Sequence, residues 1–406
     1  MKCGLLGRKL GHSYSPAIHR HLGSYDYSLF EKEPEELEHF LRHGDFTGLN
    51  VTMPYKKSVI PFLDELTPAA QKLGAVNTIV RKADGRLIGH NSDYFGFLSM
   101  VRRSGMSVKR KKCLVLGSGG ASATAVAVLQ ELGGEVYVIS RTGEHNYENL
   151  HMHADAALIV NTTPVGMYPS TGQSPVELSM FPNLDGVLDV VYNPARTQIL
   201  LDAEKRNLPT CNGLWMLVAQ AKESAEYFTE HPIDDALIHT IYCQLRQQME
   251  NIILIGMPGC GKSTVSSLLA EQTGRSLVDI DAEIKKRTGR TPGDIIRQDG
   301  EPTFRQLESK VISDFGKQSG LIIATGGGCV TKDENYEPLH QNGQIFWLQR
   351  QLSALATQGR PLSIDLSAMY ERRAPMYGAF ADYTVDNNGR PEDTAAQILA
   401  HWEKLS

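Results

Sequence analysis

The chain has 406 residues, more than one ordinary domain of about 150 residues and enough for two or three. Hydrophobic residues make up 41% and charged residues 21% of the sequence, a globular balance that excludes disorder over the whole length. The net charge is −5, whereas a general nucleic-acid binder carries a basic surface. We therefore expect a globular protein with no nucleic-acid partner.

The cysteines and the N-terminal residues favour a cytoplasmic location. Six cysteines are spread singly and form no C-x-x-C pair, so neither a disulfide framework nor a cysteine zinc site is indicated. The apolar residues before Arg8 are too few for a signal peptide. The uncharged stretch 113–130 has the length of a membrane span, but glycines and serines interrupt it. We expect no membrane partner.

Short apolar runs alternate with longer amphipathic segments along most of the chain. Strands that alternate with helices predict parallel sheets in α/β layers. The predicted strands are Cys113–Leu116, Val136–Ile139, Leu158–Val160, Val187–Val191, Ile252–Ile255, Leu321–Ala324 and Ile345–Leu348.

Four polar segments occur in the first hundred residues. They are Gly11–Pro16, Gly48–Lys56, Gly74–Thr78 and Gly89–Asp93, rich in serine, threonine and asparagine. Together they predict a cleft of neutral hydrogen-bonding groups with one lysine and one aspartate, which suits a small polyhydroxy carboxylate. Taken singly, each segment also fits ordinary turn chemistry, because turns favour Asn, Ser and Gly.

In this order, the four segments resemble the substrate domain of the shikimate dehydrogenase family. The late segments 189–197 and 213–220 match further motifs of that family, so the resemblance covers residues 1 to about 245. It implies that Lys56 and Asp93 form the catalytic pair, and Ser92 stands where the family usually has threonine. The implied substrate contacts are Ser13, Ser15, Asn50, Thr52, Asn77, Asp93, Tyr192 and Gln220.

A glycine-rich loop, Gly117–Ser122, follows a predicted strand and opens a predicted helix over 123–132. Its glycines allow backbone N–H groups to approach a pyrophosphate at the helix N-terminus. The next strand ends in Ser140-Arg141-Thr142, where an NAD enzyme would place an acidic residue. A cation and two hydroxyls suit a 2′-phosphate instead, which indicates NADP, unless Arg141 is only a solvated loop residue.

The family resemblance extends this site and also shows two departures from the pattern. It implies that NADP is bound by Gly117, Ser118, Gly119, Gly120, Ala121, Ser140, Arg141, Thr142, Thr163 and Gly213. Glu144-His145 lies where the family usually has a second basic residue. The segment 143–155 is scarcely long enough for a crossover helix, so the adenosine side of the site is expected to be trimmed.

A predicted helix over 233–249 separates this region from a second nucleotide motif, and we place a domain boundary near Met249. Beyond it, Gly256-x-x-x-x-Gly261-Lys262-Ser263 is a complete Walker A motif between a predicted strand and a helix. The loop backbone cradles phosphates, the lysine reaches the β- and γ-phosphates, and the serine holds Mg²⁺. The sequence therefore predicts a P-loop phosphotransferase that uses ATP.

Residues 250–406 resemble the shikimate kinase family. The motifs that carry the resemblance are Asp279-Ile-Asp281, Gly300 to Glu308, Gly326-Gly327-Gly328 and Arg373 to Tyr377. It implies that Asp281, Arg305, Gly326, Gly327, Gly328 and Arg373 bind substrate, and that Ser263 and Asp279 hold Mg²⁺. The implied ATP contacts are Gly256, Gly259, Cys260, Gly261, Lys262, Ser263, Thr264, Arg360 and Arg390.

The resemblance implies that Arg360 starts the mobile lid and acts, with Lys262, on the transferring phosphoryl group. Only 12 residues separate Arg360 from Arg373, so the lid is short for the family. Surface salt bridging would explain any one of these arginines alone, but not their order after a Walker A motif.

Together the resemblances imply an α/β protein with three domains. These are a substrate domain (1–100) onto which helices of 220–245 pack back, a Rossmann-like NADP domain (101–219), and a P-loop kinase domain (250–406). The implied function, in aromatic amino-acid biosynthesis, is NADPH-dependent reduction of 3-dehydroshikimate followed by ATP-dependent phosphorylation of shikimate. Two alternatives stay open: a dehydrogenase half that uses quinate or NAD, and one half that acts as a low-turnover sensor. The sequence does not indicate the oligomeric state.

Overall fold

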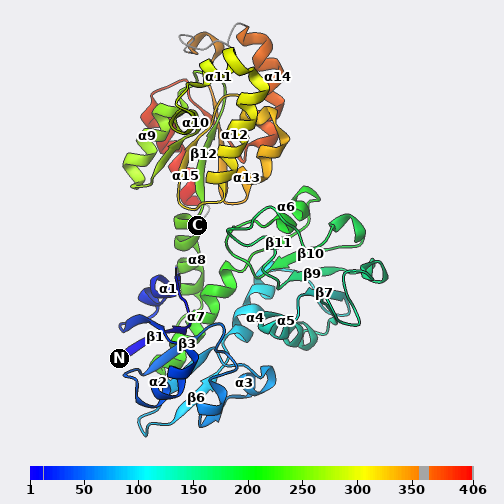
Figure 1. The fold of residues 1–406 in the computed structure, drawn as a ribbon, viewed down its shortest axis with the longest axis vertical. Helices are drawn as coiled ribbons and strands as arrows, with labels where there is room; N and C mark the ends of the chain where they lie inside the picture. Colours follow the sequence, from blue (N-terminus) through cyan, green and yellow to red (C-terminus); the bar gives the residue numbers. More distant parts are fainter. Residues whose placement is uncertain (12, 356–364, 405–406) are drawn as a thin grey trace. The chain divides into compact units, whose positions relative to one another are not determined.

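The computed structural model describes residues 1–11, 13–355 and 365–404 (Figure 1). Contacts between residues divide the chain into two compact units. Unit 1 consists of Met1–Pro164, Pro175–Tyr192 and Asp202–Tyr242. Unit 2 consists of Val165–Ser174, Asn193–Leu201 and Cys243–Ser406.

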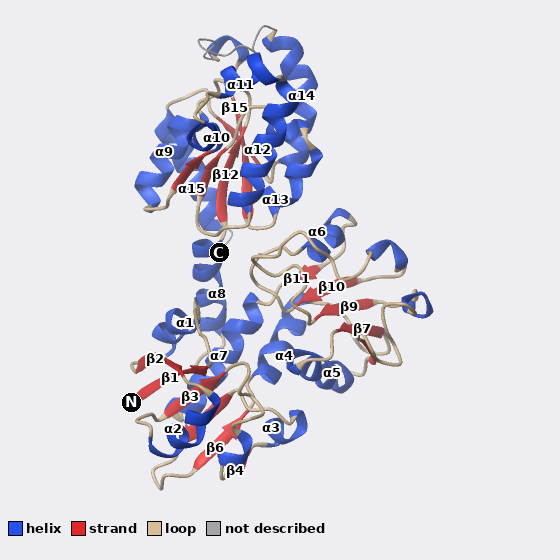
Figure 2. Cartoon of the chain, viewed as in Figure 1, coloured by secondary structure: helices blue, strands red, loops and turns tan. Residues whose placement is uncertain are grey.

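The first sheet of unit 1 has six strands in the order β2-β1-β3-β5-β6-β4 (Figure 2). Its strands are β1 (Lys2–Gly7), β2 (Asp26–Glu31), β3 (Gly48–Val51), β4 (Glu65–Leu66), β5 (Thr78–Arg81) and β6 (Leu87–His90). Strand β1 pairs in parallel with β2 and β3, whereas β5 runs antiparallel to β3 and β6. The register sets Asn50 opposite Thr78, and Thr78 opposite His90. The polar segments that the sequence separates therefore meet at one end of these strands.

Helices of the first half surround this meeting point. They are α1 (Ser15–Leu22), α2 (Leu37–His43), α3 (Pro68–Leu73), α4 (Asp93–Ser104) and α7 (Leu214–Thr229). Helix α7 contacts α1, α4, β3 and β5, so it lies beside the ends of the polar strands. One face of α7 is apolar and buried, including Leu214, Val218 and Phe228.

The second sheet of unit 1 is parallel throughout, in the order β11-β10-β9-β7-β8. Its strands are β7 (Lys112–Leu116), β8 (Glu135–Ile139), β9 (Leu158–Asn161), β10 (Gly186–Asp189) and β11 (Thr210–Cys211). Helices α5 (Gly120–Glu131) and α6 (Gln198–Lys205) belong to its crossovers. Helix α5 begins three residues earlier than predicted, because the chain turns into the helix within the glycine loop itself.

The crossover between β8 and β9 contains only one 3-10 turn, Leu150–His153. The prediction that segment 143–155 is too short for a full helix is thus confirmed. Hydrogen bonds of Asn146 and Asn149 fold the segment into a compact loop. His145 and His153 close it, with 3.2 Å between Nδ1 of the first and Nε2 of the second.

Unit 2 contains the third sheet, which is parallel in the order β13-β14-β12-β15-β16. Its strands are β12 (Asn251–Ile255), β13 (Leu277–Asp279), β14 (Ile322–Ala324), β15 (Gly343–Gln349) and β16 (Tyr383–Asp386). The four apolar residues of β12 have no exposed surface, as expected of a central strand covered on both faces. The parallel α/β layers predicted from the alternation of runs are confirmed in the second and third sheets, whereas the first sheet is mixed.

Helices of unit 2 cover both faces of this sheet (Figure 2). They are α9 (Lys262–Thr273), α10 (Ile280–Thr288), α11 (Pro292–Asp299), α12 (Glu301–Gly316), α13 (Tyr336–His340), α14 (Leu366–Phe380) and α15 (Pro391–Lys404). Before them, α8 (Ala236–Met249) begins three residues later than predicted, where the Asp234 carboxylate accepts a hydrogen bond from the Ala236 N–H. None of the helices in the described ranges is long and apolar enough to cross a bilayer.

Candidate functional site

An ion pair joins the two predicted catalytic residues of unit 1. The Lys56 ammonium lies 2.6 Å from Asp93 Oδ2, and their side chains are 29% and 16% exposed. Asp93 is the first residue of α4, where the helix N-terminus favours a carboxylate. The partial burial keeps the two charges close while one side stays open to a reactant. The pair can therefore hold a proton beside a carbonyl oxygen.

Asn50 and Asn77 are both buried, and the protein fixes the orientation of both side-chain amides. Asn77 Oδ1 accepts hydrogen bonds from the Ser92 N–H at 2.8 Å and from the Thr78 hydroxyl at 3.1 Å. Asn50 Oδ1 accepts a hydrogen bond from the hydroxyl of Tyr27 at 2.8 Å. The carbonyl end of each amide therefore faces the protein scaffold.

The other predicted substrate residues of unit 1 lie near the start of α1, after β3 and on α7. Ser13 accepts a hydrogen bond from the N–H of Ser15, the first residue of α1. Thr52 follows β3 directly, and its N–H donates to Leu6. Gln220 lies on α7, and its Oε1 is 3.3 Å from the Ser92 hydroxyl. These residues come from three separate segments of the sequence, as the sequence interpretation requires.

Tyr192 follows β10 and packs edge-on against Tyr14, with ring centroids 6.1 Å apart. Burial raises the pKa of the Tyr192 hydroxyl above its ordinary value. The hydroxyl is therefore neutral near pH 7 and can donate a hydrogen bond to an oxygen of a ligand.

The loop before α5 has the shape of a phosphate cradle. Gly117 has φ 107°, a conformation that strongly favours glycine. A Cβ at Gly119 or Gly120 would meet nothing within 4 Å, and no side chain caps α5. The free N–H groups of the first helical turn, from Gly120 to Ser122, are thus open to an anion, which fits a dinucleotide pyrophosphate.

The residues after β8 fit the 2′-phosphate of NADP. Arg141 and Thr142 are exposed, and Ser140 is tied to the compact loop through the carbonyl of His145. Thr163, on the loop after β9, donates its hydroxyl to Asn161 Oδ1 at 2.7 Å. A Cβ at Gly213 would come within 1.9 Å of the Val190 carbonyl oxygen, so this position requires glycine for a close backbone approach.

Replacement of Arg141 tests the cofactor assignment. In an Arg141→Ala chain we expect the KM for NADPH to rise by about tenfold or more, because a charge-assisted hydrogen bond contributes about 1.5–3 kcal/mol. The KM for NADH should change little, because NADH lacks the 2′-phosphate. Steady-state rates with both nucleotides measure this, and Arg102→Ala, at an exposed arginine of α4, is the control. Equal losses with both nucleotides would contradict a 2′-phosphate role.

The Walker A loop of unit 2 takes the backbone shape that its glycines predict. Gly256, Gly259 and Gly261 have φ values of 145°, 83° and 100°. The buried ammonium of Lys262 donates to the carbonyl oxygens of Gly256 at 2.9 Å and Met257 at 3.0 Å. The lysine therefore lies across the loop, within reach of a phosphate held there.

Ser263 and Asp279 meet as a magnesium site would require. The Ser263 hydroxyl lies 3.0 Å from Asp279 Oδ2, and Asp279 Oδ1 caps α10 through the N–H of Ala282. In the described part of the chain, no three His, Cys, Asp or Glu residues are grouped so that they could hold a metal ion. Mg²⁺ does not need such a group, because it keeps waters and binds substrate phosphates with one or two carboxylates. The two residues thus fit Mg²⁺ with a nucleotide.

The glycine triplet is enclosed by the predicted substrate cations. Arg373 and Arg305 are only 2% and 5% exposed. Arg373 donates a hydrogen bond to the Gly327 carbonyl at 2.9 Å. The hydroxyl of Tyr377 donates to the same carbonyl. Asp281 lies close to Gly326, since a Cβ there would be 3.2 Å from Asp281 Oδ1. The arrangement brings two fixed guanidinium groups and one carboxylate to a glycine-lined surface, which suits a hydroxylated carboxylate.

A buried carboxylate, that of Glu308, orients Arg305, and no separate role was predicted for this residue. Its Oε2 is 2.7 Å from Arg305 Nη1, and it has no exposed surface. Burial raises the pKa of Glu308, while Arg305 opposes that rise. The spacing Arg305-x-x-Glu308, one helical turn, was the signal available for this pairing.

Asn387, the first residue of a segment that the resemblance assigns to the adenine loop, anchors the Walker A loop. Its side-chain nitrogen donates a hydrogen bond to the carbonyl of Cys260. Its side-chain oxygen accepts a hydrogen bond from the Thr394 hydroxyl at 2.7 Å. Of the remaining predicted ATP residues, Thr264 lies in the first turn of α9. Arg390 is 77% exposed and pairs with Asp393, and Arg360 lies outside the described residues.

A methyl group at Gly328 should disturb the substrate cations. A Cβ at this position would lie 2.1 Å from Arg305 Nη2. In a Gly328→Ala chain we expect the KM for shikimate to rise by about tenfold or more, as when a charge-assisted hydrogen bond is lost. Gly378→Ala, on α14 where a Cβ meets nothing within 4 Å, is the matched control. A Gly328→Ala chain with an unchanged KM would contradict the role of the triplet.

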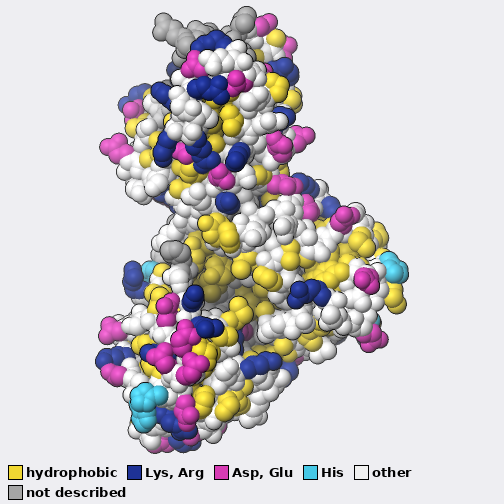
Figure 3. Space-filling model, viewed as in Figure 1, with side chains coloured by type: hydrophobic (Ala, Val, Ile, Leu, Met, Phe, Trp, Pro, Cys, Tyr) yellow, Lys and Arg dark blue, Asp and Glu magenta, His cyan; other side chains and the backbone are white. Residues whose placement is uncertain are grey.

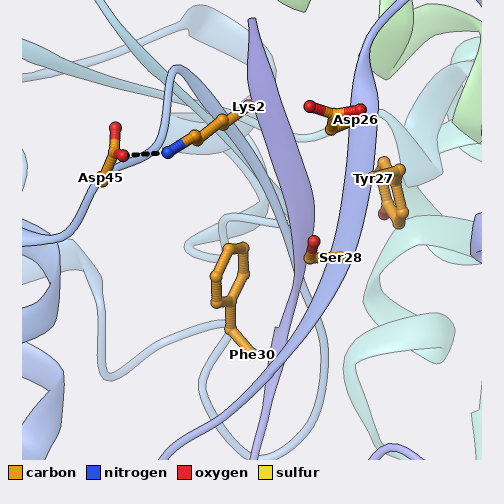
Figure 4. A pocket seen from close by; sticks show the side chains of 6 residues that line it. All are labelled: Lys2, Asp26, Tyr27, Ser28, Phe30 and Asp45. Carbon is orange, nitrogen blue, oxygen red and sulfur yellow. Dashed lines mark hydrogen bonds and ion pairs between the residues drawn. The ribbon is translucent and has the colours of Figure 1, made fainter.

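A shallow hollow lies elsewhere, on the outer strands of the first sheet (Figure 4). Lys2 and Asp45 form an ion pair at its rim, and Asp26, Tyr27, Ser28 and Phe30 complete the lining. None of these residues belongs to the predicted sites. On the face that Figure 3 shows, acidic and basic side chains intermix.

Comparisons with known proteins match both halves of the chain. Residues 5–79 match the family model "Shikimate dehydrogenase substrate binding domain", and residues 258–403 match the model "Shikimate kinase". The NADP-dependent shikimate dehydrogenase of Clostridium beijerinckii is 34% identical over 262 residues, 59% of this chain and 96% of the relative.

Two solved structures resemble the first part of the chain. Shikimate dehydrogenase 1 of Peptoclostridium difficile is 37% identical, with a TM-score of 0.56, over 60% of this chain and 97% of that one. The shikimate 5-dehydrogenase of Thermus thermophilus, solved with NADP(H) and shikimate, is 31% identical, with a TM-score of 0.54, over 60% of this chain and 99% of that one.

Proposed function

The chain belongs to the shikimate dehydrogenase family and also carries a shikimate kinase domain, and from this premise we propose that it performs two consecutive reactions. It reduces 3-dehydroshikimate to shikimate with NADPH, and it then phosphorylates shikimate to shikimate 3-phosphate with ATP and Mg²⁺. Quinate, NAD or a sensing role is not favoured, because the dehydrogenase relative from Clostridium beijerinckii is NADP-dependent and because the second half matches the shikimate kinase family.

One observation carries the proposal. The Lys56–Asp93 ion pair lies among fixed amides and hydroxyls in unit 1, and the same chain holds a Walker A lysine and two buried arginines around a glycine triplet in unit 2. The product of a ketone reduction in the first site is a hydroxyl compound that suits the second site. Two steps on one metabolite give the fusion its chemical logic.

In the reduction, bound NADPH supplies a hydride to the ring carbonyl carbon. Lys56 donates a proton to the carbonyl oxygen, and Asp93 holds the lysine in place and accepts a hydrogen bond from a substrate hydroxyl. Such a positioned proton donor contributes about 10²–10⁴ in rate. Asn50, Asn77, Gln220 and the hydroxyls of Ser13, Ser15, Thr52 and Tyr192 hold the carboxylate and the ring hydroxyls.

In the phosphorylation, the N–H groups of the Walker A loop hold the ATP phosphates. Lys262 stabilises the negative charge on the moving phosphoryl group. Arg305 and Arg373 hold the substrate carboxylate, since a planar guanidinium matches its geometry. Asp281 orients the hydroxyl that attacks, and Ser263 and Asp279 would hold Mg²⁺.

A coupled assay tests both activities in one experiment. The purified chain is given 3-dehydroshikimate, NADPH and Mg-ATP, and the products are separated by chromatography. We expect oxidation of NADPH and appearance of shikimate 3-phosphate, with shikimate as the intermediate. Formation of shikimate alone would remove the kinase assignment, and the absence of NADPH oxidation would remove the dehydrogenase assignment.

We also propose that the enzyme works in the cytoplasm on small-molecule substrates, without nucleic-acid or membrane partners. The six cysteines are spread singly along the sequence and form no C-x-x-C pair, which fits a reducing compartment. The acidic net charge of −5 argues against a nucleic-acid partner. Fractionation of cells and assay of both activities in the fractions tests the location.

A further inference from the structure

One hydroxyl on α7, that of Ser224, lies where four segments of the dehydrogenase site meet. Ser224 has no exposed surface. Its oxygen contacts Asn50 Nδ2 at 2.8 Å, Thr78 Oγ1 at 2.8 Å, Ser92 Oγ at 2.9 Å and the Gln220 carbonyl at 3.0 Å. No role was predicted for Ser224 from the sequence, because each of its partners lies on a different segment or turn.

The number of donors and acceptors shows what this hydroxyl does. A serine hydroxyl donates one hydrogen and accepts up to two. The amide nitrogen of Asn50 can only donate, so Ser224 accepts from it. That leaves one hydrogen and one acceptor position for Thr78, Ser92 and the Gln220 carbonyl. Ser224 therefore fixes the side chain of Asn50 from the end opposite to Tyr27.

The same network reaches Asn77 and the catalytic aspartate. The hydroxyls of Thr78 and Ser92 lie 3.1 and 3.2 Å from Asn77 Oδ1. Ser92 also donates its N–H to this oxygen, and the next residue, Asp93, starts α4. The network thus links Ser224 to the amide of Asn77 and to the start of the helix that presents Asp93 to Lys56.

An ordinary helical hydroxyl gives a useful contrast. On the same helix, Thr229 donates its hydroxyl to the Ala225 carbonyl four residues earlier, at 2.8 Å. Ser224 makes the equivalent bond to Gln220 and in addition contacts three side chains from three other segments. These additional contacts, rather than the helical bond, point to a functional role.

We propose that Ser224 is a positioning residue for the dehydrogenase reaction. Its hydroxyl holds Asn50 directly, and it holds Asn77 and the start of α4 through Thr78 and Ser92, in the arrangement that receives the polyhydroxy acid. The inference rests on the proposed function, because it names how the same site is held in shape.

The test compares Ser224→Ala with Thr229→Val, which removes a hydroxyl from the same helix away from the site. We expect Ser224→Ala to lower kcat/KM for 3-dehydroshikimate by about 10- to 100-fold, because buried donors lose their acceptor. The KM for NADPH and the kinase rate of the same chain should stay within about twofold of wild type. Thr229→Val should resemble wild type in every assay.

A second set of variants separates positioning from general stability. If Ser224 acts through Ser92, the loss in the double variant Ser92→Ala/Ser224→Ala should be smaller than the product of the single losses. Should the Ser224→Ala chain not fold, Ser224→Cys supplies the same test, because a thiol is both a weak donor and a weak acceptor. In either series, a kcat/KM for 3-dehydroshikimate equal to wild type overturns the inference.

Two other outcomes also decide the question. Equal losses for 3-dehydroshikimate and NADPH, with a lower melting temperature, would assign Ser224 to folding and overturn its positioning role. If the wild-type chain itself does not reduce 3-dehydroshikimate, the proposed function fails and this inference fails with it. An active wild-type chain with fully active variants removes the inference alone.

Discussion

A Lys262→Met chain should lose phosphoryl transfer and keep ketone reduction. The ammonium of Lys262 is buried and lies across the Walker A loop, bonded to Gly256 and Met257. Methionine has a similar volume but no charge, so the fold of unit 2 should survive. Because the variant lacks the ammonium that stabilises the transferring phosphoryl group, we expect the kinase rate to fall by at least about 10²–10³-fold.

Product analysis of this chain, given 3-dehydroshikimate, NADPH and Mg-ATP, should show shikimate in place of its phosphate. NADPH oxidation should stay near the wild-type rate, because the dehydrogenase site residues lie in unit 1. Lys286→Met, at a lysine that is 80% exposed, is the matched control and should leave both rates unchanged. Continued formation of shikimate 3-phosphate would contradict the kinase assignment. Loss of both activities would show that the two halves are coupled.

The sequence was sufficient to predict most strands of the second and third sheets and both glycine loops, because these depend on local patterns. The apolar run Ile252–Ile255 is a buried central strand, as a continuous hydrophobic run before a Walker A motif predicts. Element ends were less predictable. The predicted strand 187–191 ends at Asp189, where the carboxylate of this buried residue accepts the N–H of Val191 and turns the chain.

The contacts that hold the sites together could not be predicted from one sequence. Ser224 meets Asn50 across 174 positions of the chain, and Asn387 reaches Cys260 across 127. Such pairs arise only when a helix packs against the ends of particular strands, and no local spacing records that packing. Glu308 and Arg305 were the exception, since a separation of three residues on one helix places two side chains on the same face.

Removal of the dehydrogenase lysine should produce the other large effect. In a Lys56→Ala chain we expect the turnover number for 3-dehydroshikimate to fall by about 10²–10⁴-fold, the range for loss of a positioned proton donor. Lys56 is the partner of Asp93 at 2.6 Å, so its removal takes away the proton donor and leaves the carboxylate unpaired. The glycine loop before α5 lies on the second sheet. NADPH binding, measured by fluorescence titration, should therefore stay near wild type.

The neighbouring lysine supplies the control for this experiment. Lys57 has the same chemistry and is the next residue in the chain, but it is exposed, so Lys57→Ala should keep the wild-type turnover number. An Asp93→Asn variant should also be slow, and the double variant should lose little more than Lys56→Ala alone, because residues that act as one unit are not additive. An unchanged turnover number in Lys56→Ala would remove this lysine from the chemistry. Multiplicative losses in the double variant would instead mean that Lys56 and Asp93 act independently, in spite of the ion pair that joins them.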